Sequence, residues 1–193
     1  LSEIADAPSR RYDANPLLSG VELHQLLIDW NETEADYPRE HCIHDLFEAQ
    51  AKLSSDAIAV SYENEQLTYD QLNRKVNQLA HYLRAQGVGP EILVGICVER
   101  SLEMIIGILG ILKAGGAYLP IDPGYPKDRI AFMIEDACPL AVLIHKATKG
   151  ALSGSARTID LVAEANVIAQ LREDNPSRQA QAQNLAYVIY TSG

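Results

Sequence analysis

The segment Leu112–Pro126, with the sequence LKAGGAYLPIDPGYP, constrains the fold of this chain more than any other. It closes a long apolar stretch, and Gly115 and Gly116 mark the end of a helix, because glycine tolerates the left-handed backbone found there. An apolar strand is expected at Ala117–Pro120. The turn that follows ends at Pro126, which fits the first turn of another helix. Helix, strand and helix with so little slack predict a buried α/β crossover.

The same alternation extends along most of the chain. Thr68 and Gln71 form a capping-box pair that begins one of the expected helices, and Gly87 ends it. Strands are expected at 57–62, 92–98, 140–144, 157–161 and 187–190, and further helices at 43–53, 101–112, 127–135 and 163–171. A turn is expected over 63–66, and the continuous apolar run at 92–98 is typical of a strand covered on both faces. The alternation predicts an α/β fold with a largely parallel sheet and helices on both faces.

The first part of the chain differs from the rest. Residues 1–38 are polar and carry Pro8 and Pro16, which is typical of a linker, and Ser19 can cap a short helix within it. Residues 1–40 hold nine Asp and Glu against three Arg, so most of the net charge of −10 lies there. We therefore expect a linker with a short helix at 1–38 and a folded domain from 39 to 193.

Composition and charge exclude some classes of function. The net negative charge argues against a general nucleic-acid or anionic-membrane surface. The longest apolar stretch, Met104–Leu112, is far shorter than the ~20 residues needed to cross a bilayer, and no signal peptide begins the sequence. We expect a cytoplasmic protein without a disulfide framework, because its three cysteines are an odd number with wide spacing, and Cys97 is expected to be buried in the core.

Three groups of residues are candidates for chemistry. His41, Cys42 and His44 are zinc-ligand types, but their spacing matches no closed four-ligand site, so no metal is expected and His44 is placed on the polar face of its helix. Glu99–Arg100 and Asp122 follow strands, where ligands bind in parallel sheets, although a local ion pair and a turn explain them more simply. No GxGxxG string occurs, which argues against a dinucleotide-binding dehydrogenase.

The tripeptide Thr191-Ser192-Gly193 is the remaining candidate. It follows the apolar run at 187–190, and hydroxyl groups and backbone N–H groups at the carboxyl end of a strand can point together at a phosphate. Taken alone, these three residues are explained more simply by a turn.

Three sequence strings, which follow one another along the chain, favour a phosphate-binding role over a simple turn. Leu67–Leu72 (LTYDQL), Leu112–Pro126 and Leu185–Gly193 (LAYVIYTSG) resemble successive motifs of the adenylation domains of nonribosomal peptide synthetases. In that family the third motif continues through a Ser/Thr-Thr-Gly-x-Pro-Lys-Gly loop that holds the phosphates of ATP. The resemblance implies that Thr191 and Ser192 contact phosphate and that Gly193 is a hinge. It places no catalytic residue within this sequence.

The resemblance also implies a fold and an activity. The chain would be the first part of the large N-terminal subdomain, truncated at the phosphate loop, and it would show no activity by itself. With the remainder of the adenylation domain it would convert an amino acid and ATP, with Mg²⁺, to aminoacyl-AMP and pyrophosphate. The aminoacyl group would then pass to the phosphopantetheine of a peptidyl carrier domain. Which amino acid is activated cannot be read from these residues.

Two alternatives remain open from the sequence. The stretch Leu17–Pro38 resembles the linker between a condensation domain and its adenylation domain, so the chain could be a scaffold or docking fragment for an upstream condensation domain. A related acyl-CoA ligase is the other alternative. The string Ala117–Asp122 and the linker favour the peptide-synthetase branch.

Overall fold

The computed structural model describes residues 18–152 and 156–191. The chain divides into two compact units, Leu1–Pro38 and Arg39–Gly193, and each is described by itself. Among the described residues, none of the helices combines the length and the apolar character that a membrane span requires.

The described part of the first unit is a short capped helix. Helix α2 (Gly20–Leu27) begins with the capping box formed by Ser19 and Glu22, and the single turn η2 (Asp29–Asn31) follows it. The side chain of Asn31 donates hydrogen bonds to the backbone oxygens of the last turn of α2. No residue of α2 or η2 is buried. The expected helix and its cap at Ser19 are therefore confirmed.

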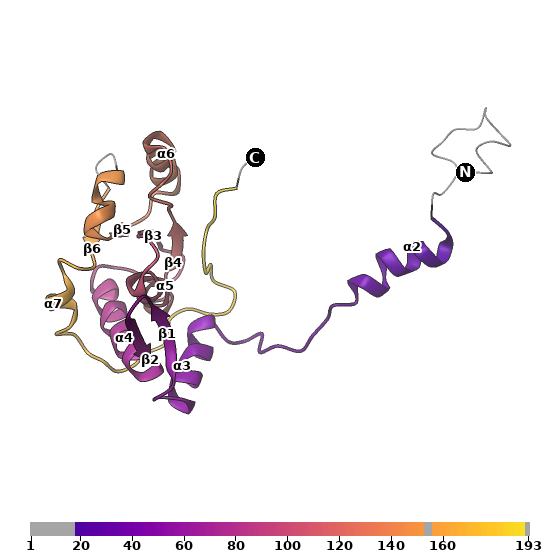
Figure 1. The fold of residues 1–193 in the computed structure, drawn as a ribbon, viewed down its shortest axis with the longest axis horizontal. Coiled ribbons are helices and arrows are strands. Elements are labelled where there is room, and N and C mark those ends of the chain that lie inside the picture. The colour runs from indigo at the N-terminus through magenta and orange to yellow at the C-terminus, as the bar shows by residue number, and fades with distance from the viewer. Residues whose placement is uncertain (1–17, 153–155, 192–193) are drawn as a thin grey trace. The chain divides into compact units, whose positions relative to one another are not determined.

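The second unit is an α/β structure (Figure 1). Its helices are α3 (Ile43–Leu53), α4 (Tyr69–Ala85), α5 (Leu102–Ala114), α6 (Lys127–Ala137) and α7 (Ala165–Ile168), with a 3-10 segment, η3 (Lys146–Ala151). Its strands are β1 (Ile58–Tyr62), β2 (Glu65–Thr68), β3 (Leu93–Cys97), β4 (Ala117–Pro120), β5 (Ala141–Ile144) and β6 (Thr158–Asp160). The last four form a parallel sheet in the order β4-β3-β5-β6, which confirms the largely parallel sheet.

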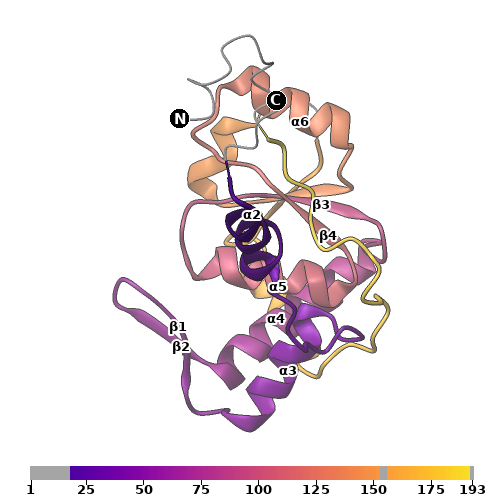
Figure 2. The same ribbon diagram turned by 90° about the vertical axis from the view of Figure 1, so that its right-hand side faces the viewer.

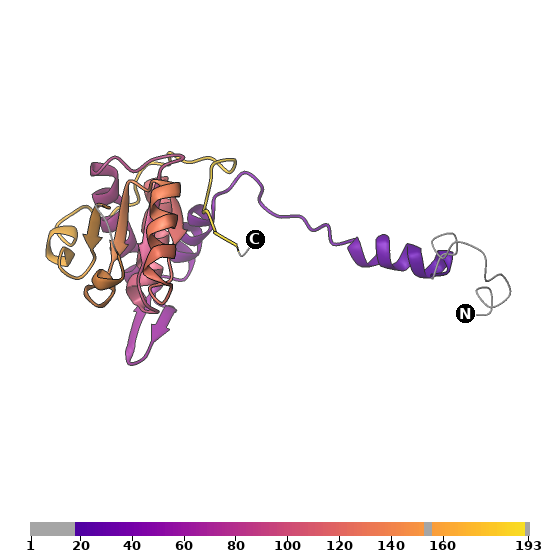
Figure 3. The same cartoon turned by 90° about the horizontal axis from the view of Figure 1, so that it is seen from above.

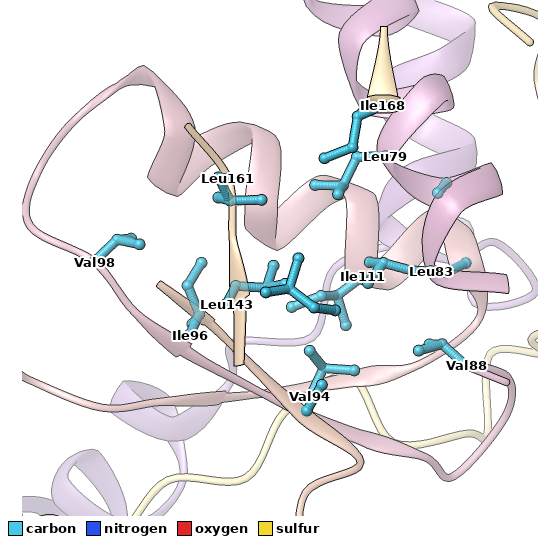
Figure 4. Packing of buried hydrophobic residues seen from close by; sticks show 14 residues of the cluster. Leu79, Leu83, Val88, Val94, Ile96, Val98, Ile111, Leu143, Leu161 and Ile168 are labelled. Atoms are coloured by element: carbon cyan, nitrogen blue, oxygen red, sulfur yellow. The ribbon is translucent and has the colours of Figure 1, made fainter. Parts of the chain in front are cut away.

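Different helices cover the two faces of this sheet. On one face, Val94 and Ile96 of β3 belong to a buried cluster with Ile111 of α5 (Figure 4). On the other face, Cys97 of the same strand belongs to a second cluster with Ile130 of α6. Alternate side chains of β3 therefore face opposite helices, as expected for a strand buried on both sides. Figure 3 shows the helices and strands of this unit from above. The prediction of helices on both faces is confirmed.

The turn between α5 and β4 depends on two glycines. Gly115 ends α5 with a left-handed backbone (φ +99°), as predicted. Gly116 lies so close to its neighbours that an added Cβ would be 2.7 Å from a Val88 methyl carbon and 3.0 Å from the Ile92 carbonyl oxygen. The backbone N–H of Ala117 then donates to that same oxygen, which starts the pairing of β4 with β3.

The structure differs from the sequence-based expectation at the β1–β2 hairpin. A turn was expected over 63–66, but Glu65 and Gln66 already belong to β2 and pair with Tyr62 and Ser61 (Figure 2). Glu63 takes a left-handed backbone (φ +51°), so the chain reverses within two residues and the ladder resumes at once. The expected helix at 163–171 is also shorter and is confined to α7.

Candidate functional site

A ligand site is expected at the carboxyl ends of β3 and β4. The chain leaves β3 through α5 on one face of the sheet and leaves β4 through α6 on the other. Neighbouring parallel strands whose connections diverge in this way create a crevice at their carboxyl ends. A cleft of about 530 Å³ lies there, between the residues that follow β3 and those that follow β4.

The polar residues at this edge have local roles. The Oδ1 atom of Asp122 accepts a hydrogen bond from the backbone N–H of Gly124 at 2.8 Å, so Asp122 forms the turn that leads into α6. Glu99 and Arg100 are both described and exposed, and no ion pair between described residues includes either of them. The turn assigned to Asp122 is confirmed, whereas the local ion pair expected for Glu99–Arg100 is wrong. The guanidinium of Arg129 lies over the ring of Tyr125, 4.5 Å from its centroid.

The segment before the candidate phosphate loop runs beside β4. The backbone N–H of Tyr118 donates to the Ala186 oxygen and the N–H of Val188 donates to the Tyr118 oxygen, each at 3.0 Å. Among the described residues of this segment, Tyr187 alone forms a bridge, with Tyr118, so the strand predicted at 187–190 is wrong. The next ladder bond would need an N–H at Pro120, and proline has none. The segment is extended, but its pairing stops after one bridge.

Tyr190 fixes the end of this extended segment. Its hydroxyl donates a hydrogen bond to the carboxylate of Asp136 on α6, and its ring meets Phe132 edge to face at 6.1 Å. The bond to Asp136 raises the pKa of the Tyr190 phenol to about 12. Thr191 follows directly and is exposed. The backbone is therefore anchored one residue before Thr191, the first of the three predicted phosphate-binding residues. The other two, Ser192 and Gly193, lie outside the described residues.

The His41–His44 region has a structural arrangement of its own. Cys42 caps α3, and its backbone N–H donates to the Asp45 carboxylate at 2.8 Å. The possible ligand atoms of Cys42, His44 and Asp45 lie within 4.8 Å of one another. The guanidinium of Arg178 reaches the same place, 3.6 Å from Asp45 and 3.7 Å from the Cys42 sulfur. The positive charge of Arg178 opposes the binding of a metal cation at the same place. The absence of a bound metal here stays a prediction.

His44 itself does not lie where the sequence placed it. Its ring is buried rather than on a polar face. Burial lowers the pKa of His44, with Asp45 and Glu48 acting in the opposite direction. The irregular segment that holds Arg178 and Ala180 contacts the start of α3 through Asp45 and Cys42. Helical periodicity does not reveal such a contact, because the two segments are far apart in the sequence.

The cysteines behave as expected from their number and spacing. Cys42, Cys97 and Cys138 are all free thiols. Cys97 is fully buried, and burial raises the pKa of its thiol to about 11. It is therefore a small buried side chain of the core, as predicted.

One polar cluster was not anticipated from the sequence. The ammonium of Lys113, on the otherwise apolar helix α5, is buried among Glu48, Asn73 and Asn77. Two signals for it are present: a lysine inside an apolar run, and two asparagines one helical turn apart on α4. Neither signal shows which residues meet, because the partners are tens of residues apart in the chain.

Comparison with known proteins identifies the family. Residues 47–193 match the model of the family described as AMP-binding enzyme. The chain belongs to this family. Its relatives include a linear gramicidin synthase protein of Brevibacillus parabrevis, which is 49% identical over 193 residues. That alignment covers 100% of this chain and 4% of the relative. Bacitracin synthase 3 of Bacillus licheniformis is 47% identical over 178 residues, which are 92% of this chain and 3% of the relative.

Solved structures agree with this assignment. The nonribosomal peptide synthetase FmoA3 in its AMPPNP-bound form aligns with a TM-score of 0.75 and 32% identity, over 85% of this chain and 18% of that one. The N-terminal subdomain of Klebsiella oxytoca NpsA shares the fold, with a TM-score of 0.69, 20% identity and coverage of 80% and 40%. The resemblance to nonribosomal peptide synthetases that the three motifs carried is confirmed. The chain spans only a few per cent of the length of the curated relatives it matches.

Proposed function

We propose that this chain is the opening part of the large subdomain of an amino-acid adenylation domain. In the whole protein, this domain joins an amino-acid carboxylate to ATP, forming aminoacyl-AMP and releasing pyrophosphate. The aminoacyl group is then passed to the phosphopantetheine thiol of a carrier domain. The observation that carries the proposal is the anchored segment at 186–190, which presents Thr191 of the string LAYVIYTSG at the surface.

The chemistry of this segment suits a phosphate group. Attack of a carboxylate on the α-phosphate needs positioned donors and charge neutralisation rather than a covalent intermediate on the enzyme. Thr191 offers an exposed hydroxyl on a backbone that Tyr190 ties to Asp136. Hydroxyl and backbone N–H donors, which we assign to Thr191, Ser192 and Gly193, fit phosphate oxygens. Mg²⁺ bound with the nucleotide would neutralise part of the phosphate charge.

The assignment of the first unit follows from the same proposal. Residues 1–38 are a linker that joins an upstream condensation domain to the adenylation domain, and residues 39–193 begin that domain. The amino-acid pocket and the rest of the phosphate loop belong to the remainder of the domain. This division agrees with the two compact units of the chain.

The test is amino-acid-dependent exchange of pyrophosphate into ATP by the full-length protein that contains this chain. We expect exchange with one amino acid or a small set of them, and no exchange by residues 1–193 alone. Fatty or aromatic acids lacking an amino group serve as the control. Exchange with such acids and not with amino acids would mean an acyl-CoA ligase. Exchange with none of them would leave the scaffold alternative.

A further inference from the structure

Helix α5 carries a cation in the interior of the molecule. The side chain of Lys113 has no exposed surface. Four oxygen atoms surround its Nζ atom: those of Asn73 and Asn77 at 2.6 Å, of Glu48 at 2.9 Å and of Asn175 at 3.0 Å. Burying an ammonium group is costly, and burial lowers the pKa of Lys113. An apolar side chain would fill the same space at less cost, so the directional bonds are the distinctive property of this lysine.

One of the four partners comes from a different kind of segment. Glu48 lies on α3, and Asn73 and Asn77 lie on α4. Asn175 lies in residues 172–185, which contain no helix or strand and are here named the strap. The amide of Asn175 also donates to the second Glu48 oxygen at 2.9 Å. Asn77 in turn donates to the Glu173 backbone oxygen at 2.6 Å. The Lys113 cluster therefore holds the beginning of the strap.

The strap leads directly to the candidate phosphate loop. Arg178 donates to the Glu40 backbone oxygen at 2.9 Å, and Asn184 donates to the Glu91 carboxylate at 2.7 Å. The next residues, 186–188, pair with Tyr118, and Thr191 follows. An irregular segment of this length adopts a single conformation only where such side-chain hydrogen bonds hold it. Its first fixed point is the Lys113 cluster.

We propose that the Lys113–Asn175 contact positions the candidate phosphate loop, with both acting as positioning residues at a distance. The contact sets where the strap begins, the strap sets how the 186–190 segment meets β4, and that segment presents Thr191. This inference rests on the proposed function. It adds to that function a determinant of ATP binding that lies far along the chain from the phosphate loop.

The decisive variant is Asn175→Ala in the full-length protein, because it removes the side-chain contacts of Asn175 while Lys113 keeps Glu48, Asn73 and Asn77. Lys113→Met is the second variant. Asn64→Ala, at an exposed asparagine of the β1–β2 turn, and Lys75→Met, at an exposed lysine of α4, are the matched controls. Three quantities are measured: amide hydrogen exchange of residues 173–190, the KM for ATP with kcat in pyrophosphate exchange, and the thermal midpoint.

We expect Asn175→Ala to speed amide exchange in the strap about five-fold or more, because the side chain of Asn175 accepts from Lys113, Asn73 and Asn77 and donates to Glu48. The KM for ATP should rise about five-fold with kcat and the KM for the amino acid little changed. The double variant with Lys113→Met should raise the KM for ATP by less than the product of the two single effects, because both changes break the contact between Lys113 and Asn175. The two controls should leave all three quantities unchanged.

Three results would overturn the inference. Unchanged strap exchange in Asn175→Ala would mean that the contact does not hold the strap. Faster strap exchange with an unchanged KM for ATP would mean that the strap does not position the loop. A parallel fall in kcat, amino-acid binding and thermal midpoint would mean a general structural role. Absence of pyrophosphate exchange in the unaltered protein would instead refute the proposed function, while strap exchange would still report on the contact.

Discussion

The ammonium of Lys113 lies 2.9 Å from the carboxylate of Glu48, and the lysine is completely buried while the glutamate keeps about a quarter of its surface exposed. Replacing Glu48 by Gln keeps an acceptor and removes the charge that offsets the buried ammonium. We expect this change to cost about 1–3 kcal/mol of unfolding free energy. Urea denaturation measures it, with Glu65→Gln at an exposed site as the control. Equal stability of the two variants would contradict the importance of this pair.

Gly115 should resist substitution because its backbone is left-handed. We expect Gly115→Val to cost at least about 1 kcal/mol through backbone strain. Gly150→Ala is the control, because a Cβ there meets nothing within 4 Å and the backbone is not left-handed. The midpoints of urea denaturation of the two variants give the comparison. A Gly115→Val protein as stable as the control would show that the end of α5 adapts without strain.

Stability should depend on pH through His44. Burial lowers the pKa of His44 in the folded chain below its ordinary 6.5. As pH falls below about 6.5, the unfolded chain takes up a proton that the folded chain does not, so stability falls until the folded pKa is reached. The slope for one group is at most about 1.4 kcal/mol per pH unit.

Two variants separate the contribution of His44 from that of the rest of the chain. Below about pH 6.5, His44→Gln should make stability depend less steeply on pH, because one group no longer contributes. His41→Gln, at an exposed site, is the control. Unfolding free energies measured at several pH values are sufficient. A profile unchanged by His44→Gln would show that the ring accepts its proton without cost.

The phosphate assignment predicts the behaviour of a double variant, Thr191→Ala with Ser192→Ala, in the full-length protein. Its pyrophosphate exchange should fall by about ten-fold or more for each lost contact to a charged oxygen, with the thermal midpoint nearly unchanged. Steady-state kinetics with ATP as the varied substrate measures the loss. Unaltered catalytic efficiency would show that these hydroxyls do not meet phosphate.

The apolar residues of the first unit predict a covered surface. A freely solvated tether would not carry so many exposed apolar side chains: Leu23, Leu26, Leu27, Ile28 and Trp30. Burying Trp30 and two of the leucines would gain several kcal/mol by area, less the entropy of ordering the segment. We expect this helix to pack on a folded surface of the full-length protein. Amide exchange of residues 21–30 in the full-length protein tests this. Amide exchange as fast as in an unfolded peptide would show that this segment is only a solvated tether.

Local signals made much of the fold predictable. The capping pairs Ser19–Glu22 and Thr68–Gln71 set helix starts through bonds within four residues, and Gly115 ended α5 through its own backbone. The continuous apolar run of β3 indicated burial on both faces, which the two hydrophobic clusters confirm. The three motif strings identified the family because their residues are contiguous in the chain.

Tertiary structure decided what distant residues do to one another. The apolar run at 187–190 has the composition of a strand, but its partner presents Pro120 where an N–H is needed, so pairing stops at Tyr187. His44 is buried at the start of α3, where Arg178 and Ala180, far along the chain, contact its neighbours Asp45 and Cys42. Lys113 is held by oxygens from three separate segments, and no periodicity brings these together. The sequence by itself determined most of the elements and the family. Long-range packing decided which polar groups meet, because that depends on how the elements are arranged in space.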